Sequence, residues 1–220
     1  MIRTGQKIAQ IIFLTFFTVL IITGKMQVWM GIFALSVILT FFFGRFYCGW
    51  FCPINTLMKV VTWIKRRLKI GILKIPRPLQ HPFFRYSLLV LFLLTFVFVM
   101  KTGRKLPVLP ALLILGTGLT LFFPEELWHR YLCPYGTILH FSGARAVRAL
   151  IVDTNLCNGC GKCSRVCSGG AVWRTDEKKY NIERESCLLC LDCIDSCPQG
   201  AIRYQHQIRA GYPQRKRVDV

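Results

Sequence analysis

Four runs of apolar residues dominate the first half of the chain: about Ile8–Thr23, Val28–Phe43, Phe84–Met100 and Leu106–Phe123. Crossing the hydrocarbon core of a bilayer takes about 20 residues, with a lower limit of about 17. The first two runs therefore span only with help from flanking residues or local thinning of the bilayer. Buried helices of a soluble core are the alternative, but a soluble domain of this size does not ordinarily contain four such runs. We predict an α-helical membrane protein with four transmembrane helices.

Basic residues gather between the second and third runs, and they predict the orientation of the chain. The loop after the first run carries only Lys25, whereas the longer loop carries Arg45, Lys59, Lys65, Arg66, Arg67, Lys69, Lys74, Arg77 and Arg85. Cytoplasmic loops of membrane proteins are enriched in Lys and Arg. We therefore expect a multi-pass protein of the prokaryotic inner membrane, with both termini in the cytoplasm. No small-residue cleavage site follows the first run, so we expect an uncleaved anchor.

The positive charge belongs to the apolar part of the chain. Residues 1–152 hold 18 Lys and Arg against 2 acidic residues, whereas residues 153–204 hold 7 of each. Because the basic residues flank apolar runs, the membrane surface explains them better than nucleic acid does. The mixed segment Asn55–Leu73 suits a helix in the headgroup region, acting as an anchor or as a docking surface for an acidic partner.

Eight cysteines in the C-terminal part form two tetrads: Cys157, Cys160, Cys163, Cys167 and Cys187, Cys190, Cys193, Cys197. Each reads C-x2-C-x2-C-x3-C, the run with which bacterial ferredoxins hold two 4Fe-4S clusters, the fourth cysteine binding the other cluster. We assign one cluster to Cys157, Cys160, Cys163 and Cys197, and the other to Cys187, Cys190, Cys193 and Cys167. A zinc site needs only four ligands, which leaves cysteines in surplus. Disulfides are disfavoured by the crowding at two-residue gaps.

The two tetrads are also an internal repeat at a spacing of thirty residues, because CNGCGKCSRVCSGGAV aligns with CLLCLDCIDSCPQGAI. Such a repeat predicts a pseudo-twofold α+β domain over residues 152–206. We expect short strands near Ala171–Arg174, Lys179–Glu183 and Ala201–Tyr204. The chain then divides into a membrane domain (1–151), the double-cluster domain (152–206) and a basic tail (207–220).

Three further cysteines follow apolar runs. The segment FFFGRFYCGWFCPINTL aligns with LFFPEELWHRYLCPYGTIL at a spacing of 81 residues. Cys52-Pro53 then falls on Cys133-Pro134, and Cys48 falls on His129. The membrane part is therefore predicted to be a duplicated helix pair. A parallel duplication predicts that both C-P steps lie on the same side of the bilayer and close together.

This combination of a C-x3-C-P motif after a span, a second C-P motif and a double-cluster run resembles the membrane polyferredoxin family. That family includes the quinol-dehydrogenase subunit of periplasmic nitrate reductase, the nitrous-oxide reductase regulatory protein and ferredoxin-type maturation factors of cytochrome oxidases. The resemblance covers nearly the whole chain. It implies that Cys48 and Cys52 are redox-active or bind a metal, and that electrons move between the quinol pool, membrane partners and metal centres.

The chain departs from the family pattern at His129, where the family has a cysteine. Cys48, Cys52, Cys133 and His129 together could still hold a metal or a cluster, because histidine can replace cysteine on iron. Alternatively, His129 is an ordinary interfacial residue and Cys133 packs as a small apolar side chain.

Several cofactors are disfavoured by the sequence. None of the four histidines lies in an apolar run and no C-x-x-C-H is present, so we expect no intrinsic haem. No flavinylation site, G-x-G-x-x-G or P-loop is found, so covalent flavin and direct use of nicotinamide or ATP are not expected.

We therefore predict a membrane-bound 4Fe-4S electron carrier that works between the quinone pool, or a membrane partner, and a redox partner complex. It would act as an electron-transfer subunit of an oxidoreductase, with quinol dehydrogenase as the candidate activity. Quinone access would lie near the interfacial residues Trp50, Trp63 and Trp128. The alternative is an assembly factor that reduces a metal or thiols while a respiratory complex is built.

Overall fold

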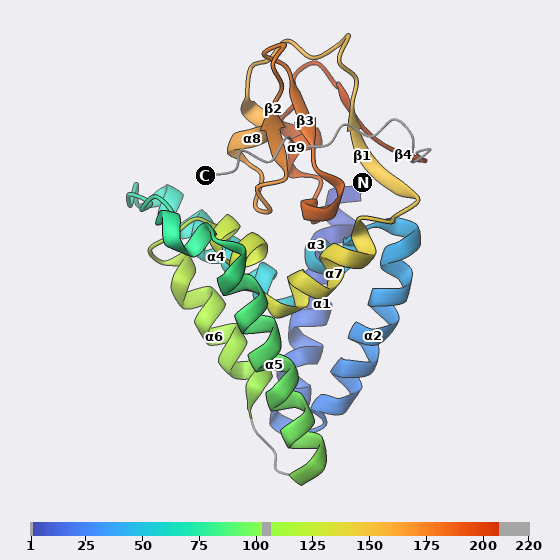
Figure 1. The fold of residues 1–220 in the computed structure, drawn as a ribbon. Helices are drawn as coiled ribbons and strands as arrows, with labels where there is room; N and C mark the ends of the chain where they lie inside the picture. Colours follow the sequence, from blue (N-terminus) through green and yellow to red (C-terminus); the bar gives the residue numbers. More distant parts are fainter. Residues whose placement is uncertain (1, 103–106, 207–220) are drawn as a thin grey trace. The chain divides into compact units, whose positions relative to one another are not determined.

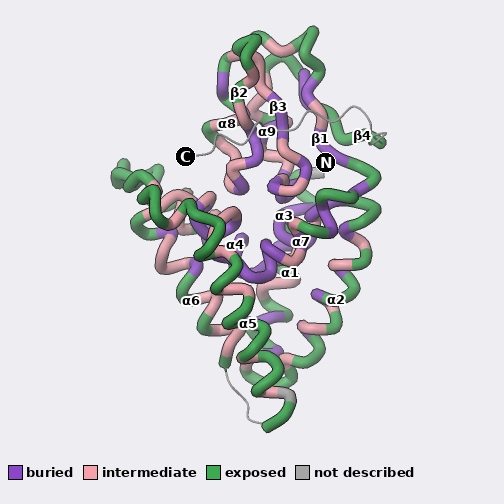
Figure 2. The backbone as a smooth tube through the Cα atoms, viewed as in Figure 1, coloured by how far each residue is buried: buried purple, intermediate pink, exposed green. Residues whose placement is uncertain are grey.

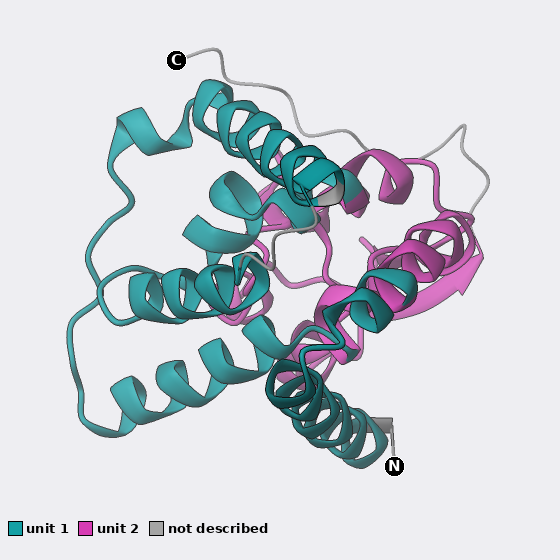
Figure 3. Cartoon of the chain, turned by 90° about the horizontal axis from the view of Figure 1, so that it is seen from below, with its two compact units in different colours: residues 1–31, 51–138 teal, residues 32–50, 139–220 magenta. Residues whose placement is uncertain are grey.

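The computed structural model describes residues 2–102 and 107–206 (Figure 1). The chain forms two compact units, one of residues 1–31 and 51–138, the other of residues 32–50 and 139–220 (Figure 3). The boundaries fall inside helix α2 (Met26–Phe43) and helix α7 (Pro134–Gly143). The expected basic tail, and Leu106 at the start of the fourth apolar run, lie outside the described residues.

Unit 1 is helical in its described part, and its apolar runs form its long helices. Its elements besides the start of α2 and the first half of α7 are α1 (Ile2–Thr23), α4 (Pro53–Arg67), η1 (Arg77–Gln80), α5 (Pro82–Thr102), α6 (Val108–Thr120) and the π-helical turn η2 (Leu127–Leu132). Among the described residues of the whole chain, three segments are long and apolar enough to cross a membrane: Arg3–Thr23, Met26–Phe43 and Pro82–Val99. The fourth run forms a helix of only 13 residues, shorter than the expected span. Leu121–Phe123 leave the helix because Pro124 follows them.

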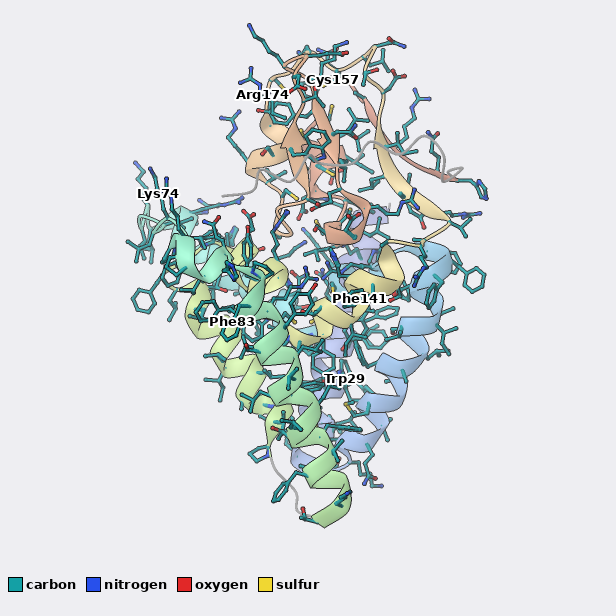
Figure 4. All side chains as sticks on the ribbon, in the orientation of Figure 1. Trp29, Lys74, Phe83, Phe141, Cys157 and Arg174 are labelled. Carbon is teal, nitrogen blue, oxygen red and sulfur yellow. The ribbon has the colours of Figure 1, made fainter. Side chains whose placement is uncertain are left out.

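The long helices carry large apolar side chains on their surface. Ile22, Leu35 and Leu94 are each more than half exposed, and exposed stretches run along α1, α2 and α5 (Figure 2). An apolar surface of this extent is unfavourable in water and suits contact with lipid chains. Aromatic packing holds α1 to the start of α2. Trp29, which is labelled in Figure 4, packs edge-on against Phe17, with 4.8 Å between the ring centroids.

The amphipathic helix is shorter than the sequence predicted. The expected helix Asn55–Leu73 begins at Pro53 and ends at Arg67. Pro53 suits a first helical position because it has no N–H to leave unsatisfied. The helix ends because Leu68 caps it and Lys69 takes a left-handed conformation at φ 52°.

α4 also packs against α1 and α6 within unit 1. Lys65 is only 4% exposed, and its Nζ donates to the carbonyl oxygen of Thr120, the last residue of α6, at 2.8 Å. That carbonyl is among the four at a helix end that lack an intrahelical partner. Lys65 therefore stabilises the end of α6 and is not available to lipid headgroups, whereas Arg66 and Arg67 stay exposed.

Unit 2 contains two antiparallel strand pairs, β1 (Arg148–Val152) with β4 (Ile202–His206) and β2 (Val172–Arg174) with β3 (Tyr180–Ile182). Short helices complete it: α3 (Phe46–Trp50), α8 (Lys162–Arg165), η3 (Arg184–Ser186) and α9 (Asp192–Ser196). Strands form at all three expected places. β1 was missed by the sequence interpretation, and it pairs with β4 although it begins before residue 152, where the double-cluster domain was expected to start.

The thirty-residue repeat is visible in the backbone of unit 2. Asp153 N–H donates to the carbonyl oxygen of Ala201 at 2.7 Å, and the equivalent Glu183 N–H donates to that of Ala171 at 2.7 Å. Each half therefore closes on a strand of the other half. The core between the halves is formed by buried apolar side chains, including Leu150, Val152, Val172, Ile182 and Ile202.

Gly116 in α6 marks a close approach of helices in unit 1. A Cβ at this position would lie 2.8 Å from Cε2 of Trp128 and 2.9 Å from Cγ2 of Ile54. We predict that Gly116→Ala destabilises the protein by about 1–3 kcal/mol, the usual cost of overpacking. The measurement is thermal unfolding of the purified protein in detergent.

Gly118→Ala is the matched control, because no described atom lies within 4 Å of its Cβ position on the same helix. It should be neutral, or stabilising by up to about 1 kcal/mol through helix propensity. Equal melting temperatures for the two variants would contradict the close packing at Gly116.

Candidate iron–sulfur centres and the C-P motifs

The first pocket of unit 2 is lined by Cys157, Cys160, Cys163 and Cys197, together with apolar and aromatic residues that include Tyr180 and Ile202. Three cysteines come from the loop before and within α8, and the fourth follows α9 in the other half of the repeat. Cys160 is exposed and Cys163 is buried, so solvent reaches one side of this pocket. Cys157 is labelled in Figure 4.

The second pocket is lined by Cys167, Cys187, Cys190 and Cys193, with Leu150, Val172, Ile182 and Leu188 around them. Cys190 and Cys193 are buried and none of the four is exposed. The backbone N–H of Ala171 donates to Cys167 Sγ at 3.2 Å. Each pocket thus gathers three cysteines of one tetrad and the fourth of the other, as the expected ligand sets require.

Both cysteine loops pass through the left-handed region at equivalent positions. The first loop has glycine there, Gly159 and Gly161, each at φ 72°. The second has Leu189 at φ 51° and Leu191 at φ 63°. A left-handed conformation costs a non-glycine residue about 1–2 kcal/mol, so the packing of these leucines must hold them in place.

Burial raises the pKa of several of these thiols. Desolvation is the main cause for Cys193 and Cys163, and the neighbouring thiols add to the effect. Burial likewise raises the pKa of Cys187 to about 12. Burial therefore opposes the charged form of these three thiols, and the thiolate is the form that binds iron.

The second cysteine loop packs against the segment Gly44–Trp50, which follows α2 in unit 2. The indole Nε1 of Trp50 donates to the carbonyl oxygen of Leu189 at 3.2 Å. A Cβ at Gly49 would overlap the carbonyl oxygen of Leu188 and lie 3.0 Å from the backbone nitrogen of Cys190. The Leu189 side chain lies against Gly44. The sequence CGW is therefore a docking surface for the loop that carries Cys187 and Cys190, and the Trp50 N–H is occupied by this contact.

Arg45 lies at the centre of this contact and is 1% exposed. Its Nη1 donates to the carbonyl oxygen of Glu185 at 2.8 Å, and its Nη2 donates to Cys48 Sγ at 3.9 Å. His140 also contacts the Glu185 carbonyl oxygen through Nδ1, at 3.1 Å. In the sequence, Arg45 served only to predict the orientation of the chain. It directly follows Gly44, which ends an apolar run, and this position indicated that Arg45 lies close to the end of the helix.

The two C-P motifs have the same local structure in unit 1. Cys52 has φ −71° and ψ 115°, and Cys133 has φ −70° and ψ 116°. Each accepts a bond at its carbonyl oxygen from a threonine hydroxyl four residues later, Thr56 at 3.1 Å and Thr137 at 3.0 Å. Both cysteines therefore begin a helix whose first residue is the proline.

The residues of unit 1 that were expected to form a redox or metal site lie in two groups. Burial raises the pKa of Tyr135 above its ordinary range, and the negative charges of Cys133 and Cys52 act in the same direction, so both cysteines lie near one phenol. His129 is buried, and its Nε2 lies 3.1 Å from Asn55 Oδ1. Cys48 belongs to unit 2, where burial raises its pKa and Arg45 opposes that effect.

The cysteines of each pocket suit a 4Fe-4S cluster better than a single metal ion. Among the described residues, no three His, Cys, Asp or Glu side chains form a site for one metal ion. A 4Fe-4S cluster binds each thiolate to a different iron, so its four cysteines need not converge on one point. Two pockets, each lined by four cysteines, match that requirement.

Comparison with known protein families agrees with this chemistry. Residues 26–71 and 106–150 each match a family described as a 4Fe-4S binding domain, and residues 156–201 match one described as a 4Fe-4S dicluster domain. The first two matches fall on the two halves of the expected duplication. The chain is a ferredoxin-type 4Fe-4S electron-transfer protein. It belongs to the family of ferredoxin-type membrane polyferredoxins.

Individual relatives are distant. An uncharacterised protein of Methanocaldococcus jannaschii is 29% identical over 77% of this chain and 68% of its own length. The ferredoxin-type protein NapH of Haemophilus influenzae is 28% identical over 73% of this chain and 62% of its own. The putative electron transport protein YccM of Escherichia coli is 25% identical over 74% and 51%. No solved structure matches the chain.

Gly49 provides a test of the docking contact. We predict that Gly49→Ala displaces the loop of Cys187 and Cys190, because its Cβ has no room beside the Leu188 carbonyl group. Bound iron should fall by about half, with the first pocket still loaded. Iron analysis of anaerobically purified protein measures this, and Gly31→Ala, with no described atom within 4 Å of its Cβ position, is the control. Full iron content in the Gly49 variant would refute the contact.

Proposed function

We propose that this protein relays single electrons between the quinone pool, or a membrane partner, and a redox partner complex. The observation that carries the proposal is the packing of the Cys187–Cys190 loop directly onto Gly44–Trp50, the segment that starts the C-x3-C-P motif. Through this contact one of the two cysteine pockets adjoins the end of an apolar helix. An electron carrier that exchanges electrons with a membrane component requires such an approach.

The proposed ligands are Cys157, Cys160, Cys163 and Cys197 for one cluster and Cys167, Cys187, Cys190 and Cys193 for the other. When bound, the clusters supply one-electron chemistry. The polypeptide supplies the thiolates, excludes water from the second pocket with Leu150, Leu188 and Ile182, and directs the Ala171 N–H at a ligand sulfur. Hydrogen bonds to sulfur and burial are the ordinary means by which a protein sets a cluster potential.

We further propose four membrane spans with both termini and the cluster domain in the cytoplasm of a prokaryote. Three helices of the described residues have the length and hydropathy for this, and the shorter apolar helix α6 is the proposed fourth. The distribution of Lys and Arg supports the orientation. We propose that the exposed residues of α4 lie in the headgroup region. Among them, Arg67 Cζ lies 5.6 Å from the centroid of the Trp63 ring.

A second candidate function is favoured by the paired C-P cysteines. Cys52 and Cys133 have matching backbone conformations, and both side chains are buried in unit 1. An assembly factor that reduces a metal or thiols during construction of a respiratory complex would use such a pair. In this candidate the expected residues of unit 1, Cys52, His129 and Cys133, are the proposed second redox site.

Paired cysteine variants test the crossed ligand sets. If Cys157 and Cys197 hold the same cluster, Cys157→Ala/Cys197→Ala should lose one cluster and keep about half of the iron. Cys187→Ala/Cys197→Ala should lose both clusters, because one ligand of each is removed. Iron and sulfide analysis with electron paramagnetic resonance measures the outcome. The reverse pattern would show that each tetrad holds its own cluster.

Reduction by quinol tests the electron path. We expect a quinol analogue, added anaerobically to the full chain in lipid nanodiscs, to produce the paramagnetic signal of reduced 4Fe-4S clusters. Cys187→Ala should slow the appearance of the remaining signal at least tenfold, because its loop faces the end of α2. Dithionite reduction is the control for intact clusters. Clusters that dithionite reduces but no quinol reduces would remove the quinol branch and leave the assembly role.

A further inference from the structure

Arg45 is a buried cation whose partners are neutral. Among the described residues Arg45 contacts no carboxylate: its Nη1 donates to the Glu185 carbonyl oxygen, its Nη2 donates to Cys48 Sγ, and its Nε has no hydrogen-bond partner. A buried charge without a counter-charge costs several kcal/mol. A backbone carbonyl and a thiol do not neutralise the guanidinium, so the fold places this cation beside something anionic.

The second cysteine pocket provides that negative charge. The Glu185 carbonyl that binds Arg45 lies two residues before Cys187, and Trp50, five residues after Arg45, binds the Leu189 carbonyl oxygen in the same loop. A cluster held by four thiolates carries net negative charge, which grows by one unit on reduction. A fixed cation nearby favours the reduced form, and its effect is strong because the site is buried.

We propose that Arg45 sets the reduction potential of the cluster held by Cys167, Cys187, Cys190 and Cys193, keeping it higher than burial alone would allow. This rests on the ligand sets of the proposed function. The guanidinium is a positioning and electrostatic residue, since it binds the cysteine loop and not the sulfur ligands. The first pocket, with its exposed Cys160, is open to solvent and is not reached by this charge through any contact that the described residues make. The two clusters are therefore tuned by different means.

A redox titration of the full chain, followed by electron paramagnetic resonance, tests this inference. In Arg45→Gln, one of the two reduction waves should move to more negative potential and the other should stay. At the wild-type midpoint of that wave, the ratio of reduced to oxidised cluster should fall at least tenfold, which is 59 mV for one electron. In Arg45→Lys, which keeps the positive charge, the reduction potential of that wave should stay close to the wild-type value. Arg203→Gln removes the same charge from an exposed site and should move neither wave.

Arg45→His keeps the test decisive if Arg45→Gln loads poorly. Its charge titrates between about pH 5 and 8, so its wave should fall more steeply with rising pH than that of the wild type. His140, which contacts the same Glu185 carbonyl group, is present in both proteins, so the pH dependence of the wild-type wave is the control for its titration. Iron-loaded variants whose waves match the wild type, or whose two waves move together, would overturn the role of Arg45. A wild-type protein without iron would instead overturn the proposed function.

Discussion

The structure of unit 2 depends on the close contact between the Cys187–Cys190 loop and the end of an apolar helix. Gly44 ends α2 in a left-handed turn, Gly49 leaves room for the Leu188 carbonyl group, and Trp50 binds the carbonyl group of Leu189. The contacts of Gly49 and Trp50 involve the main chain of the loop, so they fix its path irrespective of most side chains. The Tyr204 hydroxyl adds a bond from β4 to the carbonyl oxygen of Phe43, at 2.9 Å. The loop that carries Cys187 and Cys190 is therefore held in place by the end of α2 and by the segment Gly44–Trp50 that follows it.

The internal duplications have diverged where their environments differ. The first cysteine loop uses glycine at both left-handed positions, where a Cβ would lie 2.5 Å from the Lys178 carbonyl oxygen and 2.8 Å from the Tyr180 hydroxyl oxygen, whereas the second uses leucine. The C-P motifs keep the same backbone, but the residue four positions earlier is Cys48 in one copy and His129 in the other. Cys48 lies beside a buried arginine and His129 beside an asparagine. The two copies therefore share a backbone conformation, whereas their different neighbours give Cys48 and His129 different chemical environments.

Much of this arrangement could be predicted from the sequence, because cysteine spacing and hydropathy are local signals. The eight cysteines line two pockets in the crossed pattern, and three of the apolar runs form helices long enough to span. The strand β1 could not be predicted, since its partner β4 lies about fifty residues later and only tertiary pairing identifies it. Lys65 was misinterpreted as a lipid contact because its role depends on Thr120 of another helix. The same holds for Arg45, whose contact with Glu185 joins residues 140 positions apart.

The leucines in left-handed conformation have a consequence for the life of the protein. Their backbone is held in an unfavourable state only as long as both the sulfur ligands and the helix end restrain the loop. Loss of inorganic sulfide and iron would release one restraint, and the loop would then relax toward ordinary extended backbone and leave Trp50 without its acceptor. A chain without its cluster would thus differ from a loaded one in the path of this loop.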